Sequence, residues 1–414
     1  HLEEAWPYDP EDPGGDEADL ECDEEELWFD AIPSLSEDQL HSLDTKADFF
    51  EIDRLIRKGV LKALADDEQP EPGTKSLSSK FVRTWRRKPR HGKEAYLRRS
   101  RLCAREYRWL EVEREGLYSP ATNSAVTKLV PWFFSRMKDQ PDQYSILSLD
   151  VKDAYLECPQ LTPVIASLPR DFPAPCRYMF LKCVPGQRDG SIRWYDLLLA
   201  FLQSKIEIHV CPVCPALFTV NGSPGDPGLV HVDDLNLVAK TLWLKQTFIP
   251  LMEERFEVSY AIASEPGDTY QFLKRTHLLT PAGIIVQAPE VYAQRLAEVV
   301  GLKPGGKTVA TPCTKELLGL DATDLIGQED ARKFRTGVGI AMYVSSDRPD
   351  SAFTVRALAS RLTGPTALAW RGLKRLAAYL LSTATYGCLV AFNGTGSSIL
   401  NPHPEAEASR PLLE

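Results

Sequence analysis

Acidic residues interrupt two strongly apolar segments, and this placement limits what the chain can fold into. Asp150 ends an apolar segment that begins at Tyr144. Asp233 and Asp234 interrupt the apolar segment 229–238. An ionised carboxylate beside a protein core is costly unless it is paired or bound to a metal ion. Both segments are short, so we interpret the first as a buried strand and the second as a β-hairpin with the two acids at its turn.

The three carboxylates share a possible chemistry if the fold brings them together. Two neighbouring carboxylates repel each other, and a divalent cation compensates that repulsion. A site made of oxygen ligands favours Mg²⁺, or Mn²⁺, over Zn²⁺. Together Asp150, Asp233 and Asp234 can hold two such ions for an in-line phosphoryl displacement. The alternative is that the pair at 233 and 234 forms an ordinary turn, because Asp is common in turns.

Charge is distributed unevenly along the 414 residues, whose formal net charge is −10. Residues 1–30 hold 14 Asp or Glu and no Lys or Arg. Residues 75–108 hold 13 Lys or Arg against two Glu. The net charge is therefore an average of an acidic segment and a basic lobe, and a basic lobe is typical of nucleic-acid binding.

Helical and strand patterns are interleaved irregularly, which predicts the α+β class. Helical spacing is found at 49–64, 241–256 and 367–381, whereas basic and apolar residues alternate in 79–107 as they do in strands. No run of about 18 apolar residues is present, so we expect no membrane span. The chain begins with His1 rather than Met, which suggests a piece of a longer polyprotein.

Two segments resemble the catalytic blocks of reverse transcriptases. Segment 150–156 reads Asp-Val-Lys-Asp-Ala-Tyr-Leu and resembles the first block. Segment 229–234 reads Leu-Val-His-Val-Asp-Asp and resembles the second block, in which Tyr-x-Asp-Asp is usual. Further segments resemble, in order, those of copia-type long-terminal-repeat retrotransposons: 100–107, 118–121, 271–273, 286–292, 334–343, 348–350 and 373–380.

This resemblance implies an RNA-directed and DNA-directed DNA polymerase that transfers a nucleotide to the primer 3′-hydroxyl. Asp150, Asp233 and Asp234 would then be the catalytic residues and the ligands of two Mg²⁺ or Mn²⁺ ions. Tyr155 would be the steric gate that excludes a 2′-hydroxyl from the incoming nucleotide. The other nucleotide-binding residues would be Asp153, Arg99, Arg101, Arg105 and Gln187, and the residues at the primer and template would be Phe272, Leu273 and Lys274.

The resemblance also implies a right-hand polymerase with fingers, palm and thumb, and an antiparallel palm sheet. The domains expected from it are an acidic, disordered segment 1–45, an amino-terminal helix and fingers 46–145, a palm 146–275, a thumb or connection-like helical region 276–392, and a disordered tail 393–414. The implied partners are an RNA or DNA template with its primer, deoxynucleoside triphosphates and other polyprotein products, with no membrane. Family members replicate in cytoplasmic particles and deliver their product to the nucleus.

Several positions depart from the family pattern. His231 replaces the usual Tyr before the Asp pair, and Lys274 replaces a Gly. Segment 184–189 departs from Tyr-Gly-Leu-Lys-Gln, which affects the assignment of Gln187. No ribonuclease H, protease or integrase signature follows or precedes the matching segments, so we expect polymerisation without degradation of the template.

Three functional hypotheses remain open from the sequence. The first is an active DNA polymerase of the retrotransposon type. The second is a decayed, inactive polyprotein fragment that retains the fold. The third is another metal-dependent phosphoryl-transfer enzyme, such as a nuclease or a different nucleotidyltransferase, in which Tyr155 and the basic lobe have no obvious role.

Overall fold

The computed structural model divides into two compact units, which are described separately. Unit 1 comprises residues 1–118 and 154–197, and unit 2 comprises residues 119–153 and 198–414. The domain boundaries expected from the sequence stay a prediction. The residues that the structure describes are 24–65, 68, 70–110, 112–122, 126–139, 143–169, 172, 177–222, 225–302, 308–318, 324–392 and 399–400.

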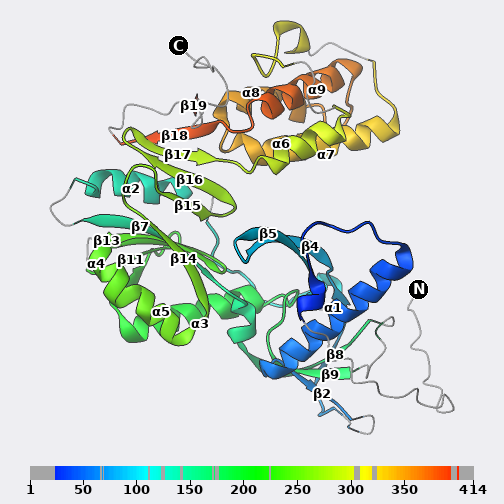
Figure 1. Ribbon diagram of the computed structural model, residues 1–414, viewed down its shortest axis with the longest axis vertical. Coiled ribbons are helices and arrows are strands. Elements are labelled where there is room, and N and C mark those ends of the chain that lie inside the picture. The colour runs from blue at the N-terminus through cyan, green and yellow to red at the C-terminus, as the bar shows by residue number, and fades with distance from the viewer. Residues whose placement is uncertain are drawn as a thin grey trace. The chain divides into compact units, whose positions relative to one another are not determined.

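Unit 1 contains two sheets and a long helix (Figure 1). A five-stranded sheet has the order β2-β9-β8-β3-β6, and a three-stranded sheet has the order β1-β5-β4. The bounds are α1 Glu37–Arg57, β1 Trp28–Phe29, β2 Leu61–Ala63, β3 Lys75–Phe81, β4 Thr84–Arg90, β5 Lys93–Arg99, β6 Leu102–Arg105, β8 Pro159–Ser167 and β9 Arg177–Lys182, with 3-10 turns η1 Glu24–Leu27, η2 Arg108–Leu110 and η4 Ala154–Glu157.

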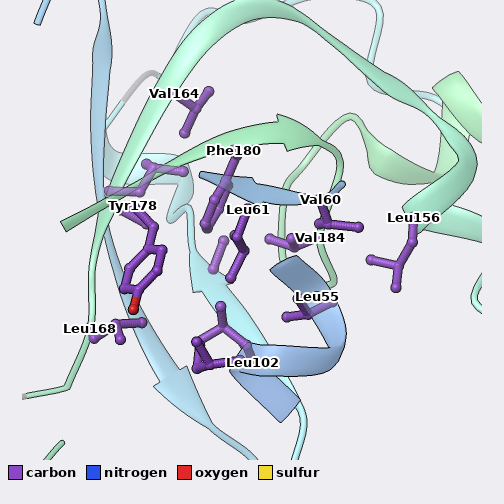
Figure 2. Packing of buried hydrophobic residues seen from close by; sticks show 14 of the residues in the cluster. Leu55, Val60, Leu61, Leu102, Leu156, Val164, Leu168, Tyr178, Phe180 and Val184 are labelled. Carbon is purple, nitrogen blue, oxygen red and sulfur yellow. The ribbon is translucent and has the colours of Figure 1, made fainter. Parts of the chain in front are cut away.

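Apolar side chains from α1 and the five-stranded sheet form the core of unit 1, shown in Figure 2. Leu55 of α1, Leu102 of β6 and Phe180 of β9 are each 1% exposed. Full burial of one such side chain stabilises a fold by about 1.5–3 kcal/mol. This cluster therefore holds together segments of unit 1 that lie far apart in the sequence.

Helix α1 begins twelve residues earlier than the helical spacing from residue 49 predicts. Ser36 and Gln39 form a capping box in which Ser36 Oγ accepts from the Gln39 N–H at 3.2 Å and Gln39 Oε1 accepts from the Ser36 N–H at 2.9 Å. Leu27 and Leu43 are buried in one cluster, so this acidic stretch does contribute to a core. The predicted disorder of segment 1–45 is wrong for residues 24–45, and residues 1–23 lie outside the described part.

Unit 2 contains two antiparallel sheets and a group of helices (Figure 1). The six-stranded sheet has the order β10-β11-β12-β13-β7-β14, and the five-stranded sheet has the order β15-β16-β17-β18-β19. The strand bounds are β7 Tyr144–Val151, β10 Ile208–Val210, β11 Leu217–Val220, β12 Asp226–His231, β13 Asp234–Lys240, β14 Val258–Ala263, β15 Thr269–Phe272, β16 Arg275–Thr280, β17 Gly283–Gln287, β18 Gly387–Ala391 and β19 Ile399–Leu400.

Helices of unit 2 form a second apolar core. Leu296, Phe334 and Leu376, from α6, α7 and α9, are fully buried in one cluster. The remaining 3-10 turns are η3 Val126–Lys128 and η6 Lys315–Leu318. The helix bounds are α2 Leu129–Met137, α3 Gly190–Lys205, which begins in unit 1 and ends in unit 2, α4 Thr241–Trp243, α5 Ile249–Arg255, α6 Val291–Val299, α7 Gln328–Ser345, α8 Pro349–Ala359 and α9 Ala367–Ser382.

The predicted α+β class with an antiparallel sheet is confirmed. The helix predicted at 367–381 corresponds to α9, and the helix predicted at 241–256 corresponds to α4, a π-helical turn at Leu244–Phe248, and α5. None of the described helices is both long enough and apolar enough to cross a membrane. The predicted disordered tail 393–414 lies outside the described residues apart from β19.

Candidate active site

Two neighbouring strands of the six-stranded sheet, β7 and β13, place Asp150 directly opposite Asp234. In the antiparallel pair of β7 and β13, the Cα partner of Asp234 is Asp150. Directly opposite residues on one face have Cβ atoms about 4.5–5.5 Å apart. A backbone hydrogen bond extends this pairing by one residue: the Val151 N–H donates to the Asp233 carbonyl at 2.9 Å. Two segments about 80 residues apart in the chain therefore bring their acidic residues to one end of the sheet.

Asp233 lies in a strained two-residue turn between β12 and β13. His231 pairs with Asp234, which leaves Val232 and Asp233 as the turn residues. Val232 has a φ of 57°, and a β-branched residue is a genuine outlier in this left-handed region. A positive φ at the first turn residue is typical of a type II′ hairpin turn, where Gly is preferred. Strain of this kind costs about 1–3 kcal/mol and clusters at functional sites.

The three carboxylates interact electrostatically. Burial raises the pKa of Asp150, and the neighbouring Asp233 raises it further. Burial raises the pKa of Asp234 to about 7, with Asp233 and Asp150 adding to the shift and Lys274 opposing it. Within the described part of the chain, however, no three Asp, Glu, His or Cys side chains already converge on a common metal position. The donor set fits a divalent cation in its chemistry, because such an ion would offset the repulsion that raises these pKa values.

The protonation of Asp234 predicts how stability depends on pH in the absence of metal ions. A carboxyl whose pKa is raised on folding stabilises the fold when protonated, so the stability that it contributes is lost as pH rises from about 4 to about 7. Replacing Asp234 by Asn should remove this loss. After a discount for solvent screening, we expect the variant to be more stable than the wild type by about 1–2 kcal/mol near pH 8, and indistinguishable near pH 4.

Urea unfolding of both proteins in a chelator, at several pH values, measures this difference. Asp139→Asn is the control, because it removes a charge from a side chain that is 81% exposed. Parallel pH profiles for the wild type and Asp234→Asn would show that the pKa of Asp234 is not raised.

His231 stands beside the Asp pair as a neutral ring. Its Nδ1 accepts from the Thr122 N–H at 3.3 Å and lies 3.1 Å from the Thr122 hydroxyl oxygen. Burial lowers the pKa of His231, although Asp233 opposes that shift. An Nδ1 that accepts leaves the proton on Nε2. Thr122 therefore fixes the tautomer of His231, a role that its own sequence context does not indicate.

The three residues predicted to meet primer and template lie in the same unit as the carboxylates. Phe272 is buried at the end of β15, and Leu273 and Lys274 form the two-residue turn to β16. Their φ values are 51° and 63°, and positive φ at both positions is typical of a type I′ turn. Such a turn favours Gly at its second position, because Gly adopts a positive φ without strain. This explains physically why the retrotransposon pattern has Gly where this chain has Lys274.

Asp153 is the second residue after β7 and has a φ of 55°. The preceding residue, Lys152, donates its N–H to the Glu257 carbonyl at 2.9 Å, and its side chain pairs with the Glu257 carboxylate. These contacts fix the chain at the point where it leaves the sheet. The predicted role of Asp153 near a triphosphate stays a prediction.

The predicted steric gate, Tyr155, lies in unit 1, on the turn η4. Its hydroxyl is 2.8 Å from Ser191 Oγ at the start of α3. Its ring lies against Gly190, where an added Cβ would stand 3.0 Å from the ring. Gly190 and Ser191 therefore set the position of this ring, and no sequence pattern points to either residue beyond the small side chain at 190.

The remaining predicted nucleotide contacts also lie in unit 1. Gln187 Oε1 accepts from the Val184 N–H at 2.7 Å and from Gln160 Nε2 at 2.8 Å, so its carbonyl stabilises its own loop. The three arginines lie on β5, on β6 and in the connection between these strands. Arg99 is the last residue of β5, Arg101 precedes β6, and the exposed Arg105 is the last residue of β6. Contacts of these residues with a nucleotide stay predictions.

The chain is similar in sequence to transposon-encoded proteins. No family model matches it. The retrovirus-related Pol polyproteins from transposons RE2 and RE1 of Arabidopsis thaliana are 26% and 23% identical to it over 303 residues, which cover 72% of this chain. The chain is similar to retrotransposon Pol polyproteins. The resemblance found in the sequence is thus confirmed at this level, and the chain spans 20% of the length of each relative.

Solved structures of foamy viral protease-reverse transcriptases are also similar to this chain. One, of the dRH form in complex with double-stranded DNA, has a TM-score of 0.43 and 11% identity and covers 88% of this chain and 54% of the other. A second, also in complex with double-stranded DNA, has a TM-score of 0.41 and 12% identity and covers 88% of this chain and 64% of the other.

Proposed function

We propose that this chain is the polymerase portion of a copia-type retrotransposon reverse transcriptase. The observation that carries the proposal is the pairing of Asp150 with Asp234, which joins the two sequence blocks that resemble reverse transcriptase motifs. The chain would extend a DNA primer on an RNA or DNA template with deoxynucleoside triphosphates. We also propose the family's localisation, in cytoplasmic particles and the nucleus.

Asp150, Asp233 and Asp234 would hold two Mg²⁺ or Mn²⁺ ions, which supply charge stabilisation to the attacking and leaving oxygens when bound. The support for this assignment is the mutual repulsion of these carboxylates and their position at the end of one sheet. Val232 holds the turn before Asp233 in a restricted conformation, so the carboxylate does not have to be ordered when substrate arrives.

The residues of unit 1 would act on the nucleotide and the template. Tyr155 would lie beneath the sugar, where a bulky ring excludes a 2′-hydroxyl, and its contacts with Gly190 and Ser191 would keep the ring in place. Arg99, Arg101 and Arg105 would bind phosphates, because the guanidinium fork matches phosphate oxygens. These roles come from the resemblance together with the local contacts.

Primer extension is the direct test of this function. The purified full chain is incubated with a labelled DNA primer on homopolymer RNA or DNA templates, with deoxynucleoside triphosphates and Mg²⁺, and a reaction containing a chelator is the control. We expect extension that requires the metal ion. Cleavage of the template without extension would instead identify a nuclease, and template binding without any reaction would identify an inactive remnant.

A further inference from the structure

An acidic segment at the amino-terminal end of unit 1 lies on a basic hairpin. The acidic segment, residues 24–29, comprises η1 and β1, and the basic hairpin comprises β4 and β5. Trp28 and Phe29 pair with Leu97 and Tyr96, so β1 adds a third strand to the hairpin. Figure 1 shows this dark-blue segment between α1 and the hairpin.

Acidic side chains of this segment pair with basic residues of the hairpin and of α1. Glu25 forms an ion pair with Arg90, which ends β4, and Glu26 forms one with Lys46 of α1. The guanidinium of Arg90 also lies over the Trp28 ring, 4.8 Å from its centroid. Arg90 is thus engaged on two sides by the acidic segment.

Apolar contacts anchor the segment while its acids stay at the surface. Leu27 is 2% exposed and packs with Leu43, Ala47 and Leu97. The Phe29 ring meets Trp85 of β4 edge to face, with 5.5 Å between the centroids. Glu24, Glu25 and Glu26 precede this anchor, and all of them are exposed.

The basic hairpin presents more positive charge than the described acids neutralise. Its strand β4 and the start of β5 expose four basic side chains, those of Arg86, Arg87, Lys88 and Lys93. Arg87 pairs with Glu94 of the neighbouring strand. A surface of this kind attracts polyanions, and most of that attraction comes from phosphate contacts that release counterions.

We propose that the acidic segment is an intramolecular competitor of nucleic acid for the basic hairpin. This inference rests on the proposed function, in which the chain binds a template. Exposed ion pairs such as those of Glu25 and Glu26 contribute little each, so a longer polyanion can displace them. A tethered competitor acts at a high effective concentration, and it therefore lowers the apparent affinity for any nucleic acid that must displace it.

Binding of a fluorescent oligo-dT single strand to charge variants of the full chain tests this competition. Glu24→Gln/Glu25→Gln/Glu26→Gln should bind the oligonucleotide about threefold to tenfold more tightly than the wild type at low salt, with the difference vanishing at high salt because both interactions are screened. Trp28→Ala removes the aromatic contact with Arg90 without changing the charge and should act in the same direction.

The matched control is Glu207→Gln/Glu253→Gln/Glu254→Gln, which removes three exposed carboxylates from unit 2. An equal gain in affinity for this control would show that net charge alone matters and would overturn the competition. Unchanged affinity in both acidic-segment variants would overturn it as well, while leaving the proposed function intact. If neither the wild type nor any variant bound the oligonucleotide, the proposed function would fail together with this inference.

The rate of backbone amide hydrogen exchange is a second measurement, and a general effect of net charge on binding would not change it. The backbone of Trp28 and Phe29 is paired with β5, so its amides are protected in the free chain. On addition of saturating oligo-dT we expect faster exchange of residues 27–29 in the wild type. Unchanged or slower exchange there would show that nucleic acid and the acidic segment do not compete.

Discussion

Primer extension should fall at least about a thousandfold when Asp150 or Asp233 is replaced by Asn, because each change removes a charged oxygen ligand where charge must be stabilised in phosphoryl transfer. The same changes relieve repulsion on Asp234, whose pKa is raised by both neighbours after the effect of burial. Neither variant should therefore be less stable than the wild type. Loss of activity with retained stability separates a chemical role from a structural one.

The measurement is the initial rate of extension on a homopolymer template with Mg²⁺, beside the midpoint of thermal unfolding. Asp139→Asn serves as the control, since it makes the same charge change on a highly exposed side chain of the same unit. Retention of more than about a tenth of the wild-type rate in either site variant would contradict the role of these carboxylates.

Arg348→Met should destabilise unit 2 by about 3–5 kcal/mol, because it leaves a buried carboxylate without its cation. The side chains of Arg348 and Asp350 are 3% and 6% exposed and lie 2.7 Å apart. Arg348 Nη1 also donates to the Thr383 carbonyl at 2.8 Å, and the Tyr379 hydroxyl donates to Asp350 at 2.6 Å. This group of contacts joins α8 to the end of α9.

Urea unfolding measures the loss of stability in Arg348→Met, and two further variants serve as comparisons. Lys333→Met breaks an exposed pair with Glu329 on α7 and should leave the stability nearly unchanged. Arg348→Met/Asp350→Asn removes both buried charges and should recover part of the stability. A cost below about 1 kcal/mol for Arg348→Met would show that Asp350 stays solvated in the folded chain.

Local patterns predicted several elements correctly. The apolar run before Asp150 corresponds to β7, and the segment around the Asp pair corresponds to the hairpin of β12 and β13. Alternation and turn chemistry act over a few residues, so one chain contains enough information for them. The start of α1 was missed because its acidic composition outweighed the capping box of Ser36 and Gln39, although that box was readable in the sequence.

Long-range pairing was the harder part of the site. That Asp150 faces Asp234 depends on the register of two strands, which the resemblance implied but no local pattern could fix. The loop that contains Gln187 is another case. Its next residue, Arg188, donates its N–H to the buried Glu106 at 2.7 Å, and these residues are 82 positions apart. Local spacing does not reveal such a partner.

The positive φ of Val232 restricts the backbone that carries the adjacent Asp233 carboxylate. A side chain branched at Cβ leaves few alternatives once φ is positive, so the peptide plane leading into Asp233 has little freedom to rotate. The pairing of His231 with Asp234 closes the other side of the turn. The turn that carries Asp233 would then move little during a reaction cycle. Gly at position 232 would relieve the backbone strain, and it would also let the Asp233 carboxylate adopt more orientations.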